Sequence, residues 1–200
     1  MYKIIAMERE YGSGGNEIGR RLAKKLGIEL YDRTILVEAA KRLGISPIYI
    51  ENLEETAPGS LIFNLSKTAL GGNRKDNPNM PMSEQLFYEE KDIIEEIVDK
   101  ESCIIVGRCA TDILKDREDC LKVFVHASQD YRIKRAIEAE NIAKDEAEEI
   151  LRKSDKRRSN FFTTHTGLKW RSMDNYDLCL DSEALGIDYC VDLLASMMKK

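Results

Sequence analysis

The segment Gly12–Gly15 constrains the fold more than any other part of the sequence. It reads Gly-Ser-Gly-Gly and joins a short apolar stretch, Tyr2–Met7, to a stretch with helical spacing, Asn16–Gly27. Glycines in such a bend let successive backbone N–H groups face one anion, and the N-terminus of the helix adds partial positive charge. A generic tight turn would explain only one or two glycines. The sequence therefore predicts a phosphate-binding loop formed by Gly12, Ser13, Gly14, Gly15 and Asn16.

The loop departs from the common nucleotide-binding pattern G-x-x-x-x-G-K-[ST] at its lysine. When Gly14 is matched to the second glycine of the pattern, Gly15 stands in the lysine position, and the hydroxyl residue for magnesium is also missing. Phosphoryl transfer depends on positioning and electrostatic stabilisation, so another cation must replace the lysine. Arg9, just before the loop, is the first candidate, and Arg20 and Arg21 are the second. The alternative is that these arginines only solvate the surface.

Apolar segments that resemble strands alternate with amphipathic helical segments along the chain. After Tyr2–Met7, the expected strands are Ile28–Tyr31, Cys103–Val106, Leu121–Val125 and Leu178–Leu180. After Asn16–Gly27, the expected helices are Thr34–Leu43, Ser83–Lys100, Asp112–Lys115, Gln129–Glu140, Lys144–Phe161 and Asp188–Met198. This alternation predicts an α/β fold of three layers, in which helices cover both faces of a five-stranded parallel sheet.

Several polar residues come directly after the expected strands. They are the loop at Gly12–Gly15, Asp32, Arg108 and Asp181. Ligands of open α/β sheets bind at the carboxyl ends of the strands, so these residues are expected on one edge. Asp32 is also placed to cap the next helix. The region 46–82 is harder to read, with helical stretches at 48–55 and 61–70 and a polar loop at 71–81.

Composition narrows the classes of function. The 200 residues suit a single domain, and the net charge of −5 argues against a general nucleic-acid binder. No apolar run approaches the roughly eighteen residues of a membrane helix. The five cysteines include no CxxC pair, which suits free thiols in a reducing compartment without a structural metal. We therefore expect a cytoplasmic protein, monomeric or homodimeric, that binds neither nucleic acid nor membrane.

The second half of the chain concentrates arginines. Arg132 and Arg135 share a helix face, and five cations gather at 152–158. Arg157 and Arg158 point about 100° apart on a helix, so they could reach different phosphates. The alternative is a solvated helix face, in which Asp155 pairs with Arg158. We expect 152–172 to form a helical lid, with its tip at 161–170, Trp170 at its base and His165 without a role.

Four segments of the chain resemble the cytidylate kinase-like family. They are Met7–Leu26 (MEREYGSGGNEIGRRLAKKL), Leu30–Arg33 (LYDR), Cys103–Leu114 (CIIVGRCATDIL) and Asp155–Ser182. The resemblance covers nearly the whole chain and is to the branch with a GSGG loop. It implies a P-loop NTPase fold similar to that of the nucleoside monophosphate kinases. Such a fold has an acceptor-binding insertion, here 33–82, and a mobile lid.

The resemblance also implies roles for single residues. Gly12–Gly15 would hold the phosphates of the donor ATP, which would bring Mg²⁺, and the donor adenine would lie near Asp181 and Ser182. Asp32 and Arg33 match the place where such kinases first contact the acceptor. Arg108 matches the arginine that binds the acceptor phosphate. From helix positions we add Arg135 to the donor site and Arg132 to the acceptor site.

Three hypotheses follow. The first is a kinase that transfers the γ-phosphoryl group of ATP to CMP, dCMP or a similar monophosphate, with Arg9, Arg157 and Arg158 as catalytic residues. A variant of it keeps the reaction and changes the acceptor. The second is a nucleotide sensor that keeps the phosphate site without the transfer chemistry. The third, disfavoured by the net charge, is a nucleic-acid binder using 152–158.

Overall fold

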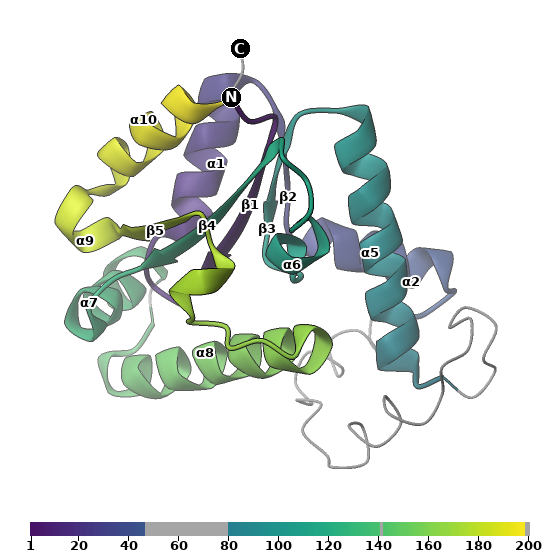
Figure 1. The fold of residues 1–200 in the computed structure, drawn as a ribbon. Coiled ribbons are helices and arrows are strands. Elements are labelled where there is room, and N and C mark those ends of the chain that lie inside the picture. Colours follow the sequence, from purple (N-terminus) through teal and green to yellow (C-terminus); the bar gives the residue numbers. More distant parts are fainter. Residues whose placement is uncertain (47–79, 141, 199–200) are drawn as a thin grey trace.

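A five-stranded parallel sheet forms the centre of the computed structural model, which describes residues 1–46, 80–140 and 142–198 (Figure 1). The strands are β1 (Ile4–Arg9), β2 (Glu29–Tyr31), β3 (Cys103–Val106), β4 (Cys120–His126) and β5 (Leu178–Asp181). They lie in the order β2-β3-β1-β4-β5, and each neighbouring pair is parallel. The predicted α/β fold with five parallel strands is confirmed.

Helices cover both faces of the sheet, each with its own apolar cluster (Figure 1). On one face, α1 (Gly15–Leu26) and α10 (Ile187–Met197) bury Ile18, Leu22 and Leu194 against β1 and β4. On the other face lie α2 (Arg33–Arg42), α5 (Met82–Lys100) and α6 (Ala110–Ile113). Burial of apolar surface on both sides explains why β1 is apolar over most of its length.

The remaining helices gather near the carboxyl ends of the strands. They are α7 (Gln129–Glu140), α8 (Lys144–Thr166) and the short α9 (Ser182–Leu185), and the 3-10 turn η2 (Met173–Asn175) follows α8. In Figure 1, α8 runs across the lower end of the sheet. A third apolar cluster of Cys109, Phe124, Phe162 and Trp170 joins α8 to the sheet. α8 therefore lies at the edge of the sheet where the ligand-binding residues are expected.

Several expected boundaries were wrong in ways that affect the site. β1 extends to Arg9 rather than ending at Met7. Asp32 occupies the predicted N-cap position of α2, but its side chain makes no capping hydrogen bond. α8 continues to Thr166 and ends at Gly167, whose φ of 77° lies in the left-handed region that suits glycine. The expected loop at 161–170 is therefore helical over most of its length.

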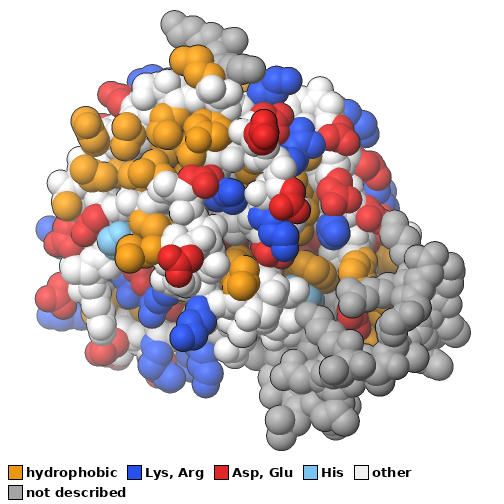
Figure 2. Space-filling view, in the orientation of Figure 1, with side chains coloured by type: hydrophobic (Ala, Val, Ile, Leu, Met, Phe, Trp, Pro, Cys, Tyr) orange, Lys and Arg blue, Asp and Glu red, His pale blue; other side chains and the backbone are white. Residues whose placement is uncertain are grey.

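The predicted insertion, 33–82, is only partly within the described residues. It contains α2 and the first residue of α5, and the helices expected at 48–55 and 61–70 lie outside the described part of the chain. Within the described residues, no helix is long and apolar enough to span a bilayer. Figure 2 shows positive and negative side chains interspersed over much of one face, with hydrophobic side chains gathered over α10.

Candidate active site

The glycine loop packs closely against neighbouring segments of the chain. Gly12 and Gly14 have φ of 74° and 80°, a conformation that favours glycine. A Cβ on Gly12 would lie 2.6 Å from the carbonyl oxygen of Arg132, and one on Gly14 would lie 2.5 Å from Cδ1 of Ile187. The first intrahelical bond of α1 runs from Ile18 N to the Gly14 oxygen at 2.9 Å. The preceding amides thus have no partner within the helix, which is the arrangement that binds anions.

Buried hydroxyl groups support this loop from behind. The Ser13 hydroxyl donates to the carbonyl of Glu10 at 2.9 Å, and the Ser182 hydroxyl donates to the carbonyl of Ser13 at 2.6 Å. Both serines are fully buried. Asp181 accepts hydrogen bonds from two N–H groups of α9, so it begins that helix. Ser13 and Ser182 therefore stabilise the loop, and Asp181 caps the N-terminus of α9.

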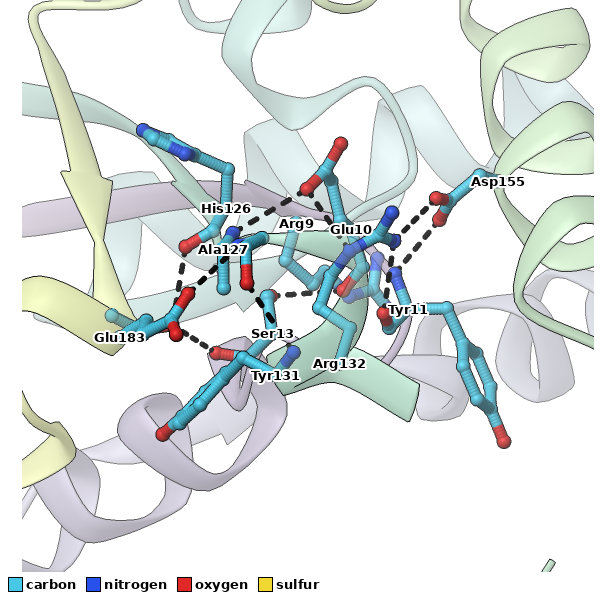
Figure 3. Close-up of polar contacts among 12 residues, drawn as sticks. Arg9, Glu10, Tyr11, Ser13, His126, Ala127, Tyr131, Arg132, Asp155 and Glu183 are labelled. Carbon is cyan, nitrogen blue, oxygen red and sulfur yellow. Dashed lines mark hydrogen bonds and ion pairs between the residues drawn. The ribbon is translucent and has the colours of Figure 1, made fainter. Parts of the chain in front are cut away.

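Buried charges fix the Gly12 end of the loop, and we call Glu10, Arg132, Asp155 and Arg171 the locking cluster. Arg132 donates to Asp155 at 2.6 Å and to the carbonyl of Tyr11 at 3.1 Å, and it lies 3.4 Å from the Glu10 carboxylate (Figure 3). Asp155 also accepts from the Tyr11 amide at 2.8 Å. Arg171 Nη2 bridges Glu10 and Asp155 at 2.7 and 2.9 Å. The two positive and the two negative side chains of the locking cluster therefore balance in charge.

The locking cluster changes two sequence-based interpretations. The alternative interpretation placed Asp155 on a solvated face as the partner of Arg158, and Asp155 is instead buried against the loop. Arg132 was expected at the acceptor site, and its guanidinium is instead engaged by Glu10, Asp155 and the Tyr11 carbonyl. Both residues hold the loop, because each joins it to a helix that is distant in sequence.

At the Gly15 end, the stem of Arg9 fills the space that a side chain at Gly15 would need. A Cβ on Gly15 would lie 2.5 Å from the Cβ and 2.9 Å from the Cγ of Arg9. The guanidinium reaches the next strand, where a Cβ on Gly107 would lie 2.6 Å from Arg9 Nη1. Arg9 Nε donates to the side chain of Asn16 at 2.9 Å. Arg9 thus runs past the lysine position and reaches Gly107.

Arg9 belongs to what we call the arginine cluster, together with Arg108 and Arg158. Arg158 Nη1 donates to the carbonyl of Arg9 at 3.1 Å, and its guanidinium lies over the Tyr11 ring. Burial, and then the charge of Arg158, lower the pKa of Arg9 to about 9. Burial also lowers the pKa of Arg158. Like charges held together under burial favour a bound anion, since it would relieve both effects.

Arg108 stands on an unusual backbone at the end of β3. Gly107, Arg108 and Cys109 have φ of 82°, 58° and 54°, and consecutive left-handed residues other than glycine are rare. The Arg108 side chain pairs with buried Glu90 at 3.3 Å and lies over the Phe161 ring, 5.7 Å from its centroid. Strain of about 1–3 kcal/mol per such residue is typical of functional sites.

Glu8 is a site residue that the sequence reasoning missed. Its carboxylate is 4% exposed and accepts a hydrogen bond from Trp170 Nε1 at 3.0 Å. Burial raises the pKa of Glu8, while the charges of Arg9, Arg158 and Arg108 oppose that rise. A glutamate inside an otherwise apolar strand was the available signal, and ending the strand at Met7 concealed it.

Arg135 lies beside the loop at Gly14. A Cβ on Gly14 would be 3.5 Å from the Arg135 guanidinium carbon. Arg135 Nη2 donates to Glu17 at 2.7 Å, and its buried Nε has no hydrogen-bond partner among the described residues. An orphaned buried donor is costly unless a ligand or water binds it. This geometry fits the expected donor-phosphate role of Arg135.

The other predicted residues lie at the margin of this arrangement. Asp32 is half-buried, and its charge acts on Arg9. Arg33 opens α2 and is exposed. Arg157 is exposed on α8, next to Arg158 in the chain. His165 stacks on Phe87, with ring centroids 3.8 Å apart, rather than lying on a loop.

Magnesium has no evident set of protein ligands in the described part of the chain. No group of three His, Cys, Asp or Glu side chains there is placed to hold a metal ion. The amides of the first turn of α1, which have no partner within the helix, and the arginines around the loop do fit a polyphosphate. The described residues therefore offer groups that bind the phosphates of the donor, but they offer no such set of ligands for Mg²⁺.

A parallel sheet with a glycine loop between its central strand and α1 defines a P-loop kinase fold. The model of the cytidylate kinase-like family matches residues 4–184, and the chain belongs to this family. No curated protein matches the chain. The expected resemblance is thereby confirmed over nearly the whole sequence.

Solved structures show the same fold. An uncharacterised protein from Eubacterium ventriosum has a TM-score of 0.72 at 24% identity, covering 98% of this chain and 97% of that one. Shikimate kinase from Acinetobacter baumannii, in complex with shikimate, has a TM-score of 0.51 at 15% identity, covering 98% and 93%. Shikimate kinase from Bacteroides thetaiotaomicron has a TM-score of 0.51 at 14% identity, covering 97% and 96%. At these identities the likeness concerns the fold alone.

Proposed function

We propose that the protein transfers the γ-phosphoryl group of ATP to a nucleoside monophosphate, with CMP or dCMP as the preferred acceptor. The observation that carries the proposal is the position of Arg9, whose stem occupies the space next to Gly15 and whose guanidinium reaches Gly107. A cation at this point supplies the charge that the missing lysine would bring. Family membership supports the choice of a kinase reaction and of a cytidylate acceptor.

The donor phosphates would be held mainly by backbone amides. The first turn of α1 offers N–H groups without intrahelical partners, and Arg135 offers a buried donor beside Gly14. Arg9 and Arg158 would meet the charge that develops on the transferred group. Fixed donors and cations in a site of low dielectric stabilise such charge strongly. Asp181, the last residue of β5, would lie near the adenine.

The acceptor would approach from the carboxyl end of β3. Arg108, oriented by Glu90 and Phe161, would bind its phosphate, with Asp32 and Arg33 nearby at the start of α2.

In the transfer step, an oxygen of the acceptor phosphate forms the new bond to the γ-phosphorus. The bond from this phosphorus to the bridging oxygen breaks, and ADP leaves with the electron pair. Arg157 on α8 would complete the positive surroundings. Magnesium would arrive with the nucleotide, and no protein residue is assigned to it.

A nucleotide sensor without transfer chemistry is the second candidate. It is favoured by glycine at the lysine position. A kinase for another small acceptor is a variant of the first. Because the chain shares its fold with shikimate kinases, shikimate should be included among the acceptors that are tested.

The test is a coupled assay of ADP release with ATP and Mg²⁺ across CMP, dCMP, UMP, AMP and shikimate. We expect turnover with CMP or dCMP that is lost in Arg108→Ala and in Arg157→Ala. Arg152→Ala is the matched control, since Arg152 is exposed on the same helix and pairs only loosely with Glu149, at 3.9 Å. ATP binding without turnover on any acceptor would identify a sensor. Turnover that survives both site variants would contradict the roles given to these arginines.

A further inference from the structure

One side of α8 is buried or half-buried along the second half of the helix. Asp155, Arg158 and Phe162 are spaced three and four residues apart, so they share this side. Asp155 is 7% exposed and Phe162 is 1% exposed, whereas Lys156 and Arg157 are exposed. Segments that move in function come from the least stable parts of a structure, which have few buried contacts. The contacts of this side therefore determine whether α8 can move as a lid.

The first set of contacts is polar and joins α8 to the backbone before the glycine loop. Asp155 accepts hydrogen bonds from the Tyr11 amide at 2.8 Å and from Arg132 at 2.6 Å (Figure 3). One turn further along α8, Arg158 donates to the carbonyl of Arg9 at 3.1 Å. A hydrogen bond to a charged group makes the state in which it is broken about tenfold to a hundredfold rarer. Several such bonds must break together before α8 leaves the loop.

The second set of contacts is apolar and lies near the end of α8. Phe162 belongs to the same apolar cluster as Phe124 of β4 and Trp170. Trp170 is 1% exposed and packs edge-to-face on Phe124, with ring centroids 5.3 Å apart. Its Nε1 donates to Glu8 of β1 at 3.0 Å. Movement of α8 away from the sheet would expose Phe162 and Trp170 to water, and large aromatic side chains contribute strongly when buried.

The segment that follows α8 is bonded back to the helix. Arg171 Nη2 donates to Asp155 at 2.9 Å and also lies 2.7 Å from the Glu10 carboxylate. The bond to Asp155 joins residues sixteen apart, so it closes the segment 155–171 on itself. Both ends of this segment thus contact residues just before the glycine loop, and its middle is packed against β4. A segment held in this way has no free end about which it could swing.

We propose that α8 and the segment that follows it, up to Arg171, form a fixed wall of the phosphate site and do not move as a lid. This differs from the mobile lid that the family resemblance implies for 152–172. Arg158 stays bonded to Arg9 whether or not a nucleotide is bound, so its charge is in place before the phosphates arrive. A polyphosphate then binds without the cost of ordering this helix. That consequence rests on the proposed phosphate site, whereas the fixed position of α8 does not.

Hydrogen exchange of backbone amides, followed by mass spectrometry on the full-length protein, tests the proposal. The experiment compares residues 155–163 with β1, in the protein alone and with saturating inorganic tripolyphosphate. In the free protein we expect the two segments to exchange within about tenfold of one another, because neither opens by itself. Tripolyphosphate should slow both by the same factor. Exchange of 155–163 that is more than about tenfold faster than that of β1, or that tripolyphosphate slows about tenfold more, would overturn the proposal.

Variants test whether the bonds of Asp155 hold the helix. Asp155→Ala removes the partner of Arg132 and Arg171, and exchange of 156–163 should become about a hundredfold faster relative to β1. Glu149→Gln is the control, because it changes an exposed carboxylate of the same helix, and exchange should be unaffected. If Asp155→Ala does not fold, Arg171→Gln removes the pairs of a half-exposed side chain and should accelerate exchange of α8 about tenfold. Unchanged exchange in the variant that folds would refute the role of these bonds.

The outcomes separate this proposal from the proposed function. If tripolyphosphate gives no binding heat and changes no exchange rate, the proposed phosphate site fails. The comparison of α8 with β1 in the free protein then still supports or overturns the fixed wall. Binding that selectively protects 155–163 would overturn the fixed wall and leave the phosphate site standing.

Discussion

Arginines and carboxylates lie near both ends of the glycine loop, but their charges are balanced at one end and not at the other. At the Gly12 end, the locking cluster pairs Arg132 and Arg171 with Glu10 and Asp155. At the Gly15 end, the three arginines of the arginine cluster face two buried carboxylates: all three act on Glu8, and Arg108 also pairs with Glu90. A balanced set of buried charges stabilises a structure, whereas a surplus of one sign favours a ligand of the other. Charge balance, rather than the number of arginines, separates the supporting end from the binding end.

The largest expected effect tests the supporting end. Arg132→Ala leaves Glu10 and Asp155 buried with only the half-exposed Arg171 as counter-ion. Breaking a buried ion pair costs about 3–5 kcal/mol, and we expect a loss of this order in the free energy of unfolding, measured in urea. The double variant Arg132→Gln/Asp155→Asn should recover part of it. A loss below about 1 kcal/mol would show that the cluster is not structural.

The next effect concerns space at the binding end. Gly15→Ala places a Cβ 2.5 Å from the Cβ of Arg9, so the arginine must shift. Overpacking of this kind costs about 1–3 kcal/mol, and a displaced Arg9 should also weaken ATP binding. Arg9→Gly/Gly15→Lys moves the cation to the customary position and should recover binding measured by calorimetry. If Gly15→Ala binds ATP normally, the close approach of Arg9 and Gly15 has no functional meaning.

A smaller effect is expected at Arg135. Its buried Nε has no partner among the described residues, so removing the side chain loses one donor to the phosphates, in addition to the ion pair with Glu17. We expect Arg135→Ala to weaken ATP binding about tenfold, equivalent to about 1.4 kcal/mol, in equilibrium dialysis. Lys134→Ala, the neighbouring exposed lysine of α7, is the control. Equal affinities for the two variants would remove Arg135 from the donor site.

The smallest effect is expected at an exposed ion pair, which serves as the reference for the two buried clusters. Lys25 on α1 and Asp192 on α10 form an exposed ion pair at 2.6 Å. Exposed pairs contribute at most about 1 kcal/mol, so Lys25→Ala should barely change the urea midpoint and should leave ATP binding intact. A loss as large as that of Arg132→Ala would mean that burial does not explain the difference between the clusters.

The sequence was informative where structure depends on neighbouring residues. Alternating apolar and amphipathic segments predicted the parallel sheet, and three glycines predicted the loop between β1 and α1. Gly167 could also have indicated the true end of α8. Such signals are local, because periodicity and glycine conformation act within a few residues.

The charged residues were harder to interpret, because their partners are distant in the sequence. Asp155 contacts the loop 144 residues away, and Trp170 contacts Glu8 across 162 residues. Helix spacing suggested Arg158 as the partner of Asp155 and gave no reason to separate Arg132 from Arg135. Which arginine is neutralised depends on how α7, α8 and β1 pack together, and that packing is visible only in three dimensions.

The measurement that tests the account most directly is the dissociation constant of ATP for Arg9→Ala, compared with the natural sequence by calorimetry. If Arg9 supplies the charge of the missing lysine, its removal should weaken binding by about two orders of magnitude, since a hydrogen bond to a charged group contributes about 1.5–3 kcal/mol. The free energy of unfolding should change little, because Arg9 is not part of the locking cluster. An affinity within threefold of the natural sequence would contradict the central claim.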